Sequence, residues 1–218
     1  MERPDNRSYK LRGARATPAQ EAAYASLWEK YGINPEGVIN LKEYFPSAQR
    51  IIMEIGTGIG EATAEIVRND PEAGYLAVEV HKPGIGALMN MANKNGSTNL
   101  RIIEEAAHLV LQHWIPDNAL DAIHLFFPDP WPKTKHKKRR IVQEPFLQLI
   151  SPKIKAGGYI HIATDWIEYA SWIAEVFKSS TLFHGGVIER PNFRPVSKFE
   201  GQGLRKGHTV TDFRFFKS

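Results

Sequence analysis

Short apolar segments alternate with helix-like segments along most of this chain. After Pro46, runs rich in Ile, Leu and Val are separated by stretches whose apolar residues recur at helical spacing. Strands that alternate with helices form a parallel sheet covered on both faces. We therefore expect an α/β fold with a mostly parallel sheet. The predicted strands are 51–55, 75–80, 100–103, 120–126 and 159–163, the predicted helices between and after them end near residues 68, 91, 114 and 178, and a β-rich tail covers 209–216.

The first 16 residues differ in character from the rest of the 218-residue chain. Residues 1–16 carry five Lys or Arg and few apolar side chains, which predicts a mobile basic arm. Thr17 to Gln20 has a capping-box pattern with proline at the first helical position. A helix is therefore expected to begin there and to end near Tyr31. Residues 17–218 are expected to form a single domain.

The composition restricts the partners of the chain. It has 28 Lys and Arg against 24 Asp and Glu, a formal net charge of +4, and no cysteine. Disulfides and thiolate metal sites are therefore excluded, and since the histidines lack metal-binding spacing we expect no metal. We find no apolar run long enough to cross a bilayer and no signal-peptide pattern. We expect a cytoplasmic protein with no membrane partner.

A glycine-rich turn is expected to bind a nucleoside cofactor. Gly56, Gly58 and Gly60 follow the first predicted strand and open a helix, and Glu79 ends the next strand. Glycine permits a tight turn and lets a ligand approach the backbone closely. A carboxylate at the end of the second strand can accept hydrogen bonds from both ribose hydroxyls of an adenosine-containing cofactor. The glycines alone are a weak signal, but strand, helix and acid together favour such a site.

The choice of cofactor depends on the glycine spacing and on Glu54. Dinucleotide sites favour G-x-G-x-x-G, whereas the third glycine comes one residue early here. Glu54, just before the glycines, would repel a pyrophosphate. It suits a ligand with an ammonium and a sulfonium group, namely S-adenosylmethionine. The alternative for Glu54 is a solvated charge at a strand end.

A second loop joins a constrained carboxylate to a run of cations. Asp129 lies between Pro128 and Pro130, and each proline restricts the backbone next to it. Residues 133–140 then contain six Lys or Arg. Such a run fits a phosphate backbone, although most charge runs are solvated faces. Because the loop follows the carboxyl end of a strand, where ligands bind in such sheets, we favour an active-site loop that meets a nucleic acid.

Taken in order, these motifs resemble the bacterial tRNA (guanine-N7)-methyltransferase family. The resemblance runs from about residue 50 to the end and includes Glu54-Ile55-Gly56-x-Gly58-x-Gly60, Glu79-Val80-His81, Pro128-Asp129-Pro130-Trp131, Ala163-Thr164-Asp165-Trp166 and Arg194-Pro195-Val196-Ser197-Lys198-Phe199-Glu200. It implies a Rossmann-like class I methyltransferase fold with a seven-stranded, mostly parallel sheet. It also implies transfer of a methyl group from S-adenosyl-L-methionine to a guanosine in the variable loop of tRNA.

The resemblance also implies roles for individual residues. Asp129 matches the catalytic acid of the family. The positions expected to bind the cofactor are Glu54, Gly56, Gly58, Gly60, Glu79, Val80, His81, Glu105 and Ala106. Those expected to bind the substrate nucleoside are Lys133, Asp165, Ser197, Lys198, Phe199 and Glu200. Those expected to face the RNA backbone are Lys135, His136, Lys137, Lys138, Arg139 and Arg140.

One position departs from the family pattern. After the third strand the family has an Asp, which in related methyltransferases reaches the adenine amino group, and this chain has Ala106. A methyl side chain cannot accept a hydrogen bond. Either Glu105 substitutes for the missing acid or the backbone alone holds the adenine ring. The departure concerns cofactor affinity more than the type of reaction.

The chemistry of guanine N7 sets what the site must supply. N7 carries a lone pair and no proton, so methylation there needs no general base, and catalysis should come from positioning and electrostatics. A fixed carboxylate would favour the positive charge that develops on the purine and could accept hydrogen bonds from guanine N1–H and the amino group. Asp129 and Asp165 are the candidates, with Glu200 third. Asp165 could equally cap the helix that follows it, with Thr164 as a competing cap.

Other functions remain open from the residues alone. The same fold could act on another RNA, on a small molecule or on a protein, although the latter two need no track of cations. A nucleotide-binding oxidoreductase is disfavoured by Glu54 and by the early third glycine. An RNA-binding protein without catalysis is suggested only by Ala106. Trp131 could stack on an unpaired base or pack the loop onto the domain.

Overall fold

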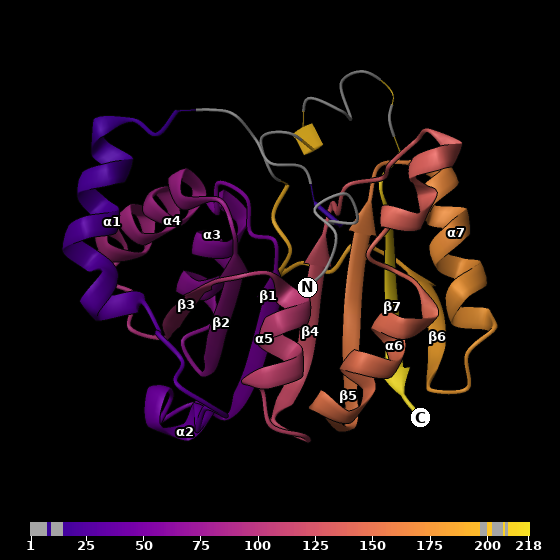
Figure 1. The fold of residues 1–218 in the computed structure, drawn as a ribbon, viewed down its shortest axis with the longest axis horizontal. Helices are drawn as coiled ribbons and strands as arrows, with labels where there is room; N and C mark the ends of the chain where they lie inside the picture. The colour runs from indigo at the N-terminus through magenta and orange to yellow at the C-terminus, as the bar shows by residue number, and fades with distance from the viewer. Residues whose placement is uncertain (1–7, 10–14, 197–199, 202–206, 208) are drawn as a thin grey trace.

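A single seven-stranded sheet forms the centre of the computed structural model, which describes residues 8–9, 15–196, 200–201, 207 and 209–218 (Figure 1). The strand order is β3-β2-β1-β4-β5-β7-β6. Strands β1 to β5 pair in parallel, whereas β7 is antiparallel to both β5 and β6. After β1 the chain continues to β2 on one side, and after β4 it continues to β5 on the other, so the loops that follow these two paired strands leave a crevice at their carboxyl ends.

The elements follow the predicted alternation closely. The strands are β1 (Arg50–Ile55), β2 (Ala73–Glu79), β3 (Leu100–Glu104), β4 (Leu120–Phe126), β5 (Ile154–Thr164), β6 (Phe183–Ile188) and β7 (Thr211–Lys217). The helices are α1 (Pro18–Tyr31), α2 (Leu41–Tyr44), α3 (Glu61–Asn69), α4 (Lys82–Lys94), α5 (Ala107–His113), α6 (Glu144–Ile150) and α7 (Ile167–Lys178), with the 3₁₀ segments η2 (Thr134–Arg139) and η3 (Ser151–Lys153). The predicted capping box of α1 is confirmed in both of its hydrogen bonds.

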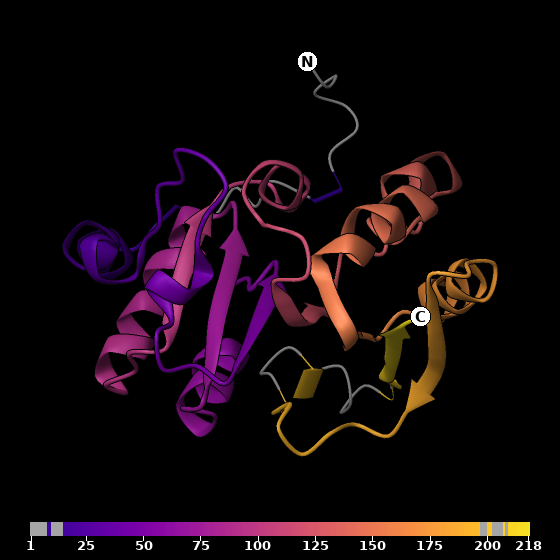
Figure 2. The ribbon, with the colours of Figure 1, turned by 90° about the horizontal axis from the view of Figure 1, so that it is seen from below.

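Helices cover both faces of the sheet, as Figure 2 shows. Alternate strand residues point to opposite faces, so Met53 packs in a core with α5, α6 and α7 while Ile52 packs in a second core with α1, α3 and α4. Burial of both faces explains why the strands are continuous apolar runs. This confirms the predicted α/β fold with a mostly parallel sheet. Among the described residues, no helix is both long and apolar enough to span a bilayer.

The connection between β6 and β7, residues 189–210, is called the strap here. Its described part lies on the same face of the sheet as α3 and α4, but over the other half, next to β4, β5 and β7. The Phe193 ring stacks on the His124 ring of β4 with centroids 5.4 Å apart and meets the His161 ring of β5 edge-on at 5.7 Å. The sheet therefore has helices over β1 to β3 and the strap over β4, β5 and β7 on this one face (Figure 2).

Three elements were not predicted from the sequence: α2, α6 and β6. Strand β6 contains Gly185-Gly186, which resembles a turn rather than a strand. A side chain at position 185 would meet the Arg214 carbonyl oxygen of β7 at 2.2 Å. Glycine is therefore needed for the close approach of two backbones, and β6 is defined by its pairing with β7.

Candidate functional site

A cavity of about 950 Å³, part of it open to solvent, lies at the carboxyl ends of β1, β2 and β4. Cofactor and small-molecule sites favour this edge of an open parallel sheet. The cavity is lined by Ser8, Tyr9, Ile55, Gly56, Gly58, Val78, Glu79, Val80, His81, Glu105, Ala106, Ala107, Leu125, Phe126, Phe127, Pro128, Asp129 and Ile141. The predicted glycine turn and the predicted Asp129 loop therefore face one another across a single space.

The glycine turn has a backbone that only glycine adopts easily. The φ angles are +75° at Gly56, +61° at Gly58 and +81° at Gly60, all in the left-handed region. A side chain at Gly84, in the first turn of α4, would meet the Gly58 carbonyl oxygen at 1.9 Å. The turn is thus pressed against α4 and offers bare backbone to the cavity. Gly60 does not line the cavity but caps α3.

Glu79 ends β2 and connects the two turns that flank the cavity. Its Oε2 accepts a hydrogen bond from the Gly58 N–H at 2.7 Å, and its Oε1 accepts from the Val80 and His81 N–H groups at 2.7 and 2.9 Å. The side chain is buried at the wall of the cavity. Glu79 therefore fixes the glycine turn as well as presenting a carboxylate to the space, and only the second role was predicted.

Glu54 is buried beside the cavity and does not line it. Its Oε1 accepts a hydrogen bond from the Thr63 hydroxyl at 3.0 Å, while its Oε2 has no partner among the residues that the structure describes. Burial raises the pKa of this carboxyl to about 7, with a further contribution from the charge of Glu79. A solvated, idle charge is therefore excluded. The arrangement leaves one buried oxygen available to a cationic group.

Glu105 and Ala106 line the cavity on the β3 side, where the departure from the family pattern lies. Glu105 Oε1 accepts the hydrogen bond of the Ala106 N–H at 2.7 Å, which folds the acid back onto the turn before α5. Ala106 is buried as the first residue before the helix. Glu105 and Ala106, both expected to bind the cofactor, are thus at the cavity wall. Glu105 is the acid nearest in sequence to position 106, where the family has an Asp.

The loop that carries Asp129 is strained as well as proline-rich. Phe127 and Trp131 have φ angles of +50° and +44°, a conformation that costs a bulky residue energy and that clusters at functional sites. The Phe127 N–H donates to the Ala163 carbonyl at 2.8 Å, which ties the loop to the end of β5. Asp129 lies between these two residues and lines the cavity. The prolines predicted rigidity here, but no sequence signal predicted the two left-handed residues.

Trp131 packs the loop onto the domain rather than offering a free face to a base. It is 5% exposed, and the Arg139 guanidinium lies 5.0 Å from the ring centroid. Its indole N–H donates to the carbonyl oxygen of Ser8 at 3.0 Å. Ser8 and Tyr9 in turn line the cavity. This part of the predicted arm therefore belongs to the site, whereas residues 1–7 and 10–14 lie outside the described residues.

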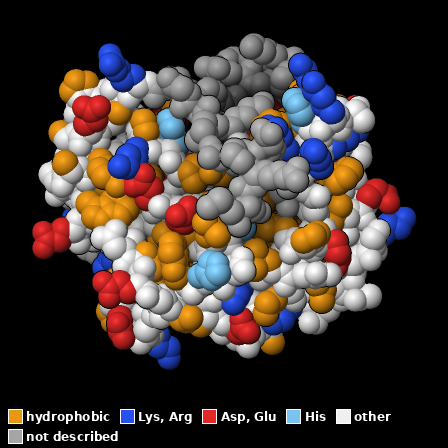
Figure 3. Space-filling model, viewed as in Figure 1, with side chains coloured by type: hydrophobic (Ala, Val, Ile, Leu, Met, Phe, Trp, Pro, Cys, Tyr) orange, Lys and Arg blue, Asp and Glu red, His pale blue; other side chains and the backbone are white. Residues whose placement is uncertain are grey.

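The cationic run forms η2, which Lys133 precedes. Lys133, Lys135 and Lys138 are exposed, and His136, Lys137 and Arg139 are half-buried. Lys and Arg side chains gather with a histidine at the upper right of the space-filling view, over the position of η2 in Figure 1 (Figure 3). The run is thus an accessible cationic surface adjoining the Asp129 loop.

The prediction that Arg140 faces the RNA backbone is wrong. Its side chain is 1% exposed, and the guanidinium lies over the rings of Tyr169 and Trp172 with centroid distances of 4.9 and 5.1 Å. A group buried in this way cannot contact a phosphate. The sequence suggested otherwise because charge alone does not distinguish the last residue of the run from its neighbours.

Asp165 follows β5 and precedes α7, half-exposed near the edge of the sheet that carries the cavity. The alternative in which Asp165 or Thr164 occupies the cap position of α7 does not hold. The cap position is Trp166, whose side chain makes no cap hydrogen bond, and the Thr164 hydroxyl accepts the Trp166 N–H at 3.3 Å. Asp165 and Lys133 do not line the cavity, so they stand as predicted substrate residues outside the cofactor space.

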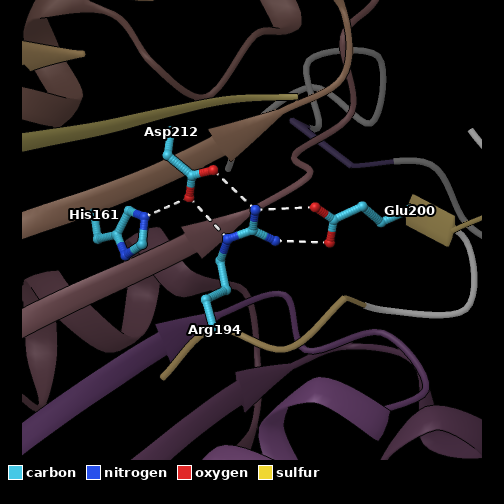
Figure 4. Close-up of polar contacts among 4 residues, drawn as sticks. All are labelled: His161, Arg194, Glu200 and Asp212. Atoms are coloured by element: carbon cyan, nitrogen blue, oxygen red, sulfur yellow. Dashed lines mark hydrogen bonds and ion pairs between the residues drawn. The ribbon is translucent and has the colours of Figure 1, made fainter. Parts of the chain in front are cut away.

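Glu200 is buried in a network that the sequence did not predict. Both of its oxygens accept hydrogen bonds from Arg194, at 2.8 and 3.0 Å, and Arg194 also bonds both oxygens of Asp212 (Figure 4). Asp212 Oδ1 further contacts His161 Nε2 at 2.7 Å. Glu200 thus faces Arg194 and not the cavity, which departs from its expected contact with substrate. Ser197, Lys198 and Phe199 lie outside the described residues.

The sequence is similar to a methyltransferase family and to tRNA-modifying enzymes of several bacteria. Residues 48–213 match a family described as putative methyltransferases. A tRNA (guanine-N(7)-)-methyltransferase of Nitrosomonas europaea is 46% identical, covering 99% of this chain and 98% of the relative. Those of Neisseria meningitidis and Streptomyces avermitilis are 44% and 42% identical, covering 96% of this chain and 90% and 74% of the relatives.

The chain belongs to the tRNA (guanine-N7)-methyltransferase family. Solved structures of other methyltransferases share its fold at low identity. The 16S rRNA methyltransferase KamB has a TM-score of 0.60 at 12% identity, over 86% of this chain and 98% of that one. TrmN from Thermus thermophilus has a TM-score of 0.55 at 15% identity, over 82% of this chain and 47% of that one. These likenesses confirm the class I methyltransferase fold of this family member.

Proposed function

We propose that this family member transfers a methyl group from S-adenosyl-L-methionine to N7 of a guanosine in the variable loop of tRNA. One observation carries the proposal: a cavity at the carboxyl ends of the parallel strands, between a glycine turn and a strained loop that holds Asp129, with exposed lysines following directly. The relatives named as tRNA (guanine-N(7)-)-methyltransferases support the same conclusion. The protein would act in the cytoplasm as one domain from residue 17, with residues 1–16 as a basic arm.

The residues around the cavity fit the proposed cofactor. Glu54 leaves a buried oxygen without a partner among the described residues, which suits a cationic ammonium group. The carboxylate of Glu79 is placed to accept from ribose hydroxyls, since Oε2 accepts one hydrogen bond among the described residues, from the Gly58 N–H, and a carboxylate oxygen can accept two. Ala106 and the backbone of Val80 and His81 leave room for the flat adenine ring, with Glu105 as the neighbouring acceptor. When bound, S-adenosylmethionine supplies a methyl group activated by its positively charged sulfur.

The chain's own residues then position the acceptor and stabilise charge. Because guanine N7 has no proton to lose, none of them has to act as a general base. Asp129 faces the cavity from a loop that cannot relax easily, so its negative charge is fixed where the purine becomes positive. Asp165 is half-exposed and directly follows β5, which leaves it to accept guanine N–H groups outside the cofactor space. Lys133 is proposed to bind the substrate nucleoside, and the exposed lysines of the cationic run that follows it are proposed to hold tRNA phosphates.

Glu200 enters this proposal in a modified form. Its carboxylate is bound to Arg194, so we assign it to the attachment of the strap, from which Ser197, Lys198 and Phe199 would reach the nucleoside. The proposal retains these three residues as substrate positions on the strength of the motif alone.

The deciding experiment combines the protein with unmodified tRNA and labelled S-adenosylmethionine, followed by nucleoside analysis. The expected product is 7-methylguanosine confined to the variable loop, and no product from tRNA whose variable-loop guanosine is replaced by adenosine. Label in another nucleoside or in ribosomal RNA only would instead support the alternative, a methyltransferase of the same fold with another RNA substrate. Transfer to a small molecule without RNA would support the other alternative.

A further inference from the structure

Arg140 is the most deeply buried cation of the site region and makes contacts that no phosphate-binding residue needs. Its Nε donates to the Pro130 carbonyl oxygen at 2.9 Å. Pro130 follows Asp129 directly, so this hydrogen bond holds the carboxyl end of the catalytic loop. Residues 131–139 lie between Pro130 and Arg140 and include η2. The hydrogen bond from Arg140 to Pro130 closes this segment into a loop.

The other side of Arg140 is held by α7. Its guanidinium lies between the rings of Tyr169 and Trp172, at 4.9 and 5.1 Å from their centroids. Cations are attracted to the faces of aromatic rings, more strongly when water is excluded. The same two side chains bind Val142, with its N–H donating to the Tyr169 hydroxyl at 3.4 Å and its carbonyl accepting from the Trp172 indole at 2.7 Å. The segment 140–142 is therefore anchored to α7 through side chain and backbone.

This anchor lies close to both candidate carboxylates. Asp129 directly precedes Pro130, whose carbonyl oxygen Arg140 binds, and its negative charge adds to the burial that raises the pKa of the Tyr169 phenol. Asp165 precedes α7 by two residues, and Tyr169 belongs to the first turn of that helix. Arg140 thus spans from the loop after β4 to the helix after β5, the two elements that carry Asp129 and Asp165.

We propose that Arg140 is a positioning residue that holds the Asp129 loop against α7 and thereby fixes Asp129 relative to Asp165 during methyl transfer. It belongs to the cationic run by sequence only. The inference rests on the proposed function for its catalytic part, while the contact to Pro130 stands on the geometry alone. A displacement of the reacting groups by about 1 Å is enough to cost up to a hundredfold in rate.

The test uses two substitutions that separate the hydrogen bond from the charge. Arg140→Gln keeps an N–H donor at the position of Nε and removes the positive charge. Arg140→Lys keeps the charge and places a methylene at that position. Single-turnover methylation at saturating tRNA should be reduced about tenfold to a hundredfold for Arg140→Lys, which releases Pro130, and less for Arg140→Gln, which keeps that hydrogen bond but loses the ring contacts with α7. A phosphate contact would give the opposite order, because lysine preserves it and glutamine does not.

Two further measurements make the outcome independent of turnover. The salt dependence of tRNA binding should be unchanged in both Arg140 variants, whereas Lys138→Gln, from the exposed part of the run, should flatten it. Amide hydrogen exchange of the peptide 127–131 should be faster in Arg140→Lys than in Arg140→Gln. Equal exchange in the two variants, or a flattened salt dependence in Arg140→Gln, would overturn the inference. Absence of methylation by the wild-type protein would instead overturn the proposed function.

Discussion

Arg194 and Asp212 form a buried bidentate ion pair, with Nε and Nη2 of the arginine each 2.8 Å from an oxygen of the aspartate. The two side chains are 2% and 3% exposed. Asp212 belongs to β7 and Arg194 to the strap, so the pair fixes the strap to the sheet. The guanidinium also lies 5.6 Å from the Phe127 ring centroid, which brings the strap into contact with the loop that carries Asp129. One buried cation thus joins the proposed substrate segment to the proposed catalytic loop.

Removal of this cation should destabilise the protein strongly. Arg194→Met leaves Asp212 and Glu200 as buried acids without their shared partner, and breaking a buried ion pair typically costs about 3–5 kcal/mol. Urea unfolding at neutral pH measures the loss. Arg190→Met, an exposed arginine in the same strap, serves as the matched control and should change the free energy of unfolding little. Equal effects of the two substitutions would show that the network contributes no net stability.

Glu54→Gln should stabilise the protein and weaken cofactor binding at the same time. The folded-state pKa of Glu54 is raised from 4.5 to about 7, so its contribution to stability is complete below pH 4.5 and is lost as the pH rises through 7. Glutamine stays neutral, and at about pH 8 it should raise the free energy of unfolding by on the order of 3 kcal/mol, since the pKa of Glu54 rises by about 2.5, at about 1.4 kcal/mol for each unit. Calorimetry should show weaker binding of S-adenosylmethionine, because an amide cannot pair with an ammonium group. The exposed Glu65→Gln is the control, and tighter or unchanged binding by Glu54→Gln would contradict the role given to Glu54.

Glu79→Ala should lose cofactor affinity through two effects. It removes the proposed acceptor for ribose and also the three backbone hydrogen bonds that hold the glycine turn and the start of α4. Hydrogen bonds to a charged group contribute about 1.5–3 kcal/mol each, so at least this much binding free energy should disappear. The measurement is calorimetry with S-adenosylhomocysteine. The control is Glu104→Ala. Glu104 lies opposite Glu79 on the neighbouring strand β3 and does not line the cavity, so this variant should bind the ligand normally.

Charge removal from the exposed part of the run should reduce the salt dependence of tRNA binding. Each phosphate contact that is lost lowers the slope of log affinity against log salt concentration by roughly 0.7–0.9. The double substitution Lys135→Gln with Lys138→Gln should therefore lower the slope by about 1.4–1.8. Lys42→Gln with Lys94→Gln removes two exposed lysines from α2 and α4 and should leave it unchanged. An identical slope in wild type and the first double variant would reduce the run to a solvated surface.

Asp129→Asn should fold normally and bind cofactor but lose turnover. The substitution keeps the shape of the side chain and removes the charge that offsets the positive purine, and loss of such a preorganised group costs about 10²–10³ in rate. Single-turnover methylation at saturating tRNA measures this directly. Asp117→Asn, in the exposed turn after α5, should remain fully active. A near wild-type rate for Asp129→Asn would transfer the catalytic assignment to Asp165.

The sequence predicted best those features that depend on neighbouring residues. The glycine turn was predictable because Gly56, Gly58 and Gly60 have a local conformational reason to be glycine, and all three have positive φ angles. Asp129 was identified through its flanking prolines for the same reason. Its position on the cavity wall agrees with the prediction drawn from those prolines.

The features that escaped prediction depend on partners far away in the sequence. Arg140 resembles its charged neighbours until Tyr169 and Trp172 are brought against it, about thirty residues later in the chain. Glu200 is only six residues from Arg194, but the pair is buried because Arg194 is also held by Asp212 of β7, farther along the chain. Strand β6 exists only through its pairing with β7. Tertiary burial decides each of these cases, and a one-dimensional pattern of charge or glycine carries no record of it.

The division of one sheet face between helices and strap follows the order of the chain. The glycine turn, Glu79 and Ala106 all precede the exposed turn at Asp117 and Asn118, while Asp129, Asp165 and the strap all follow it. Chimeras of two relatives joined at this turn would exchange the half with the Asp129 loop, the cationic run and the strap, and would retain the glycine turn, Glu79 and Ala106. The β1–β4 seam is where such hybrids would have to match, since the two halves of the sheet meet there.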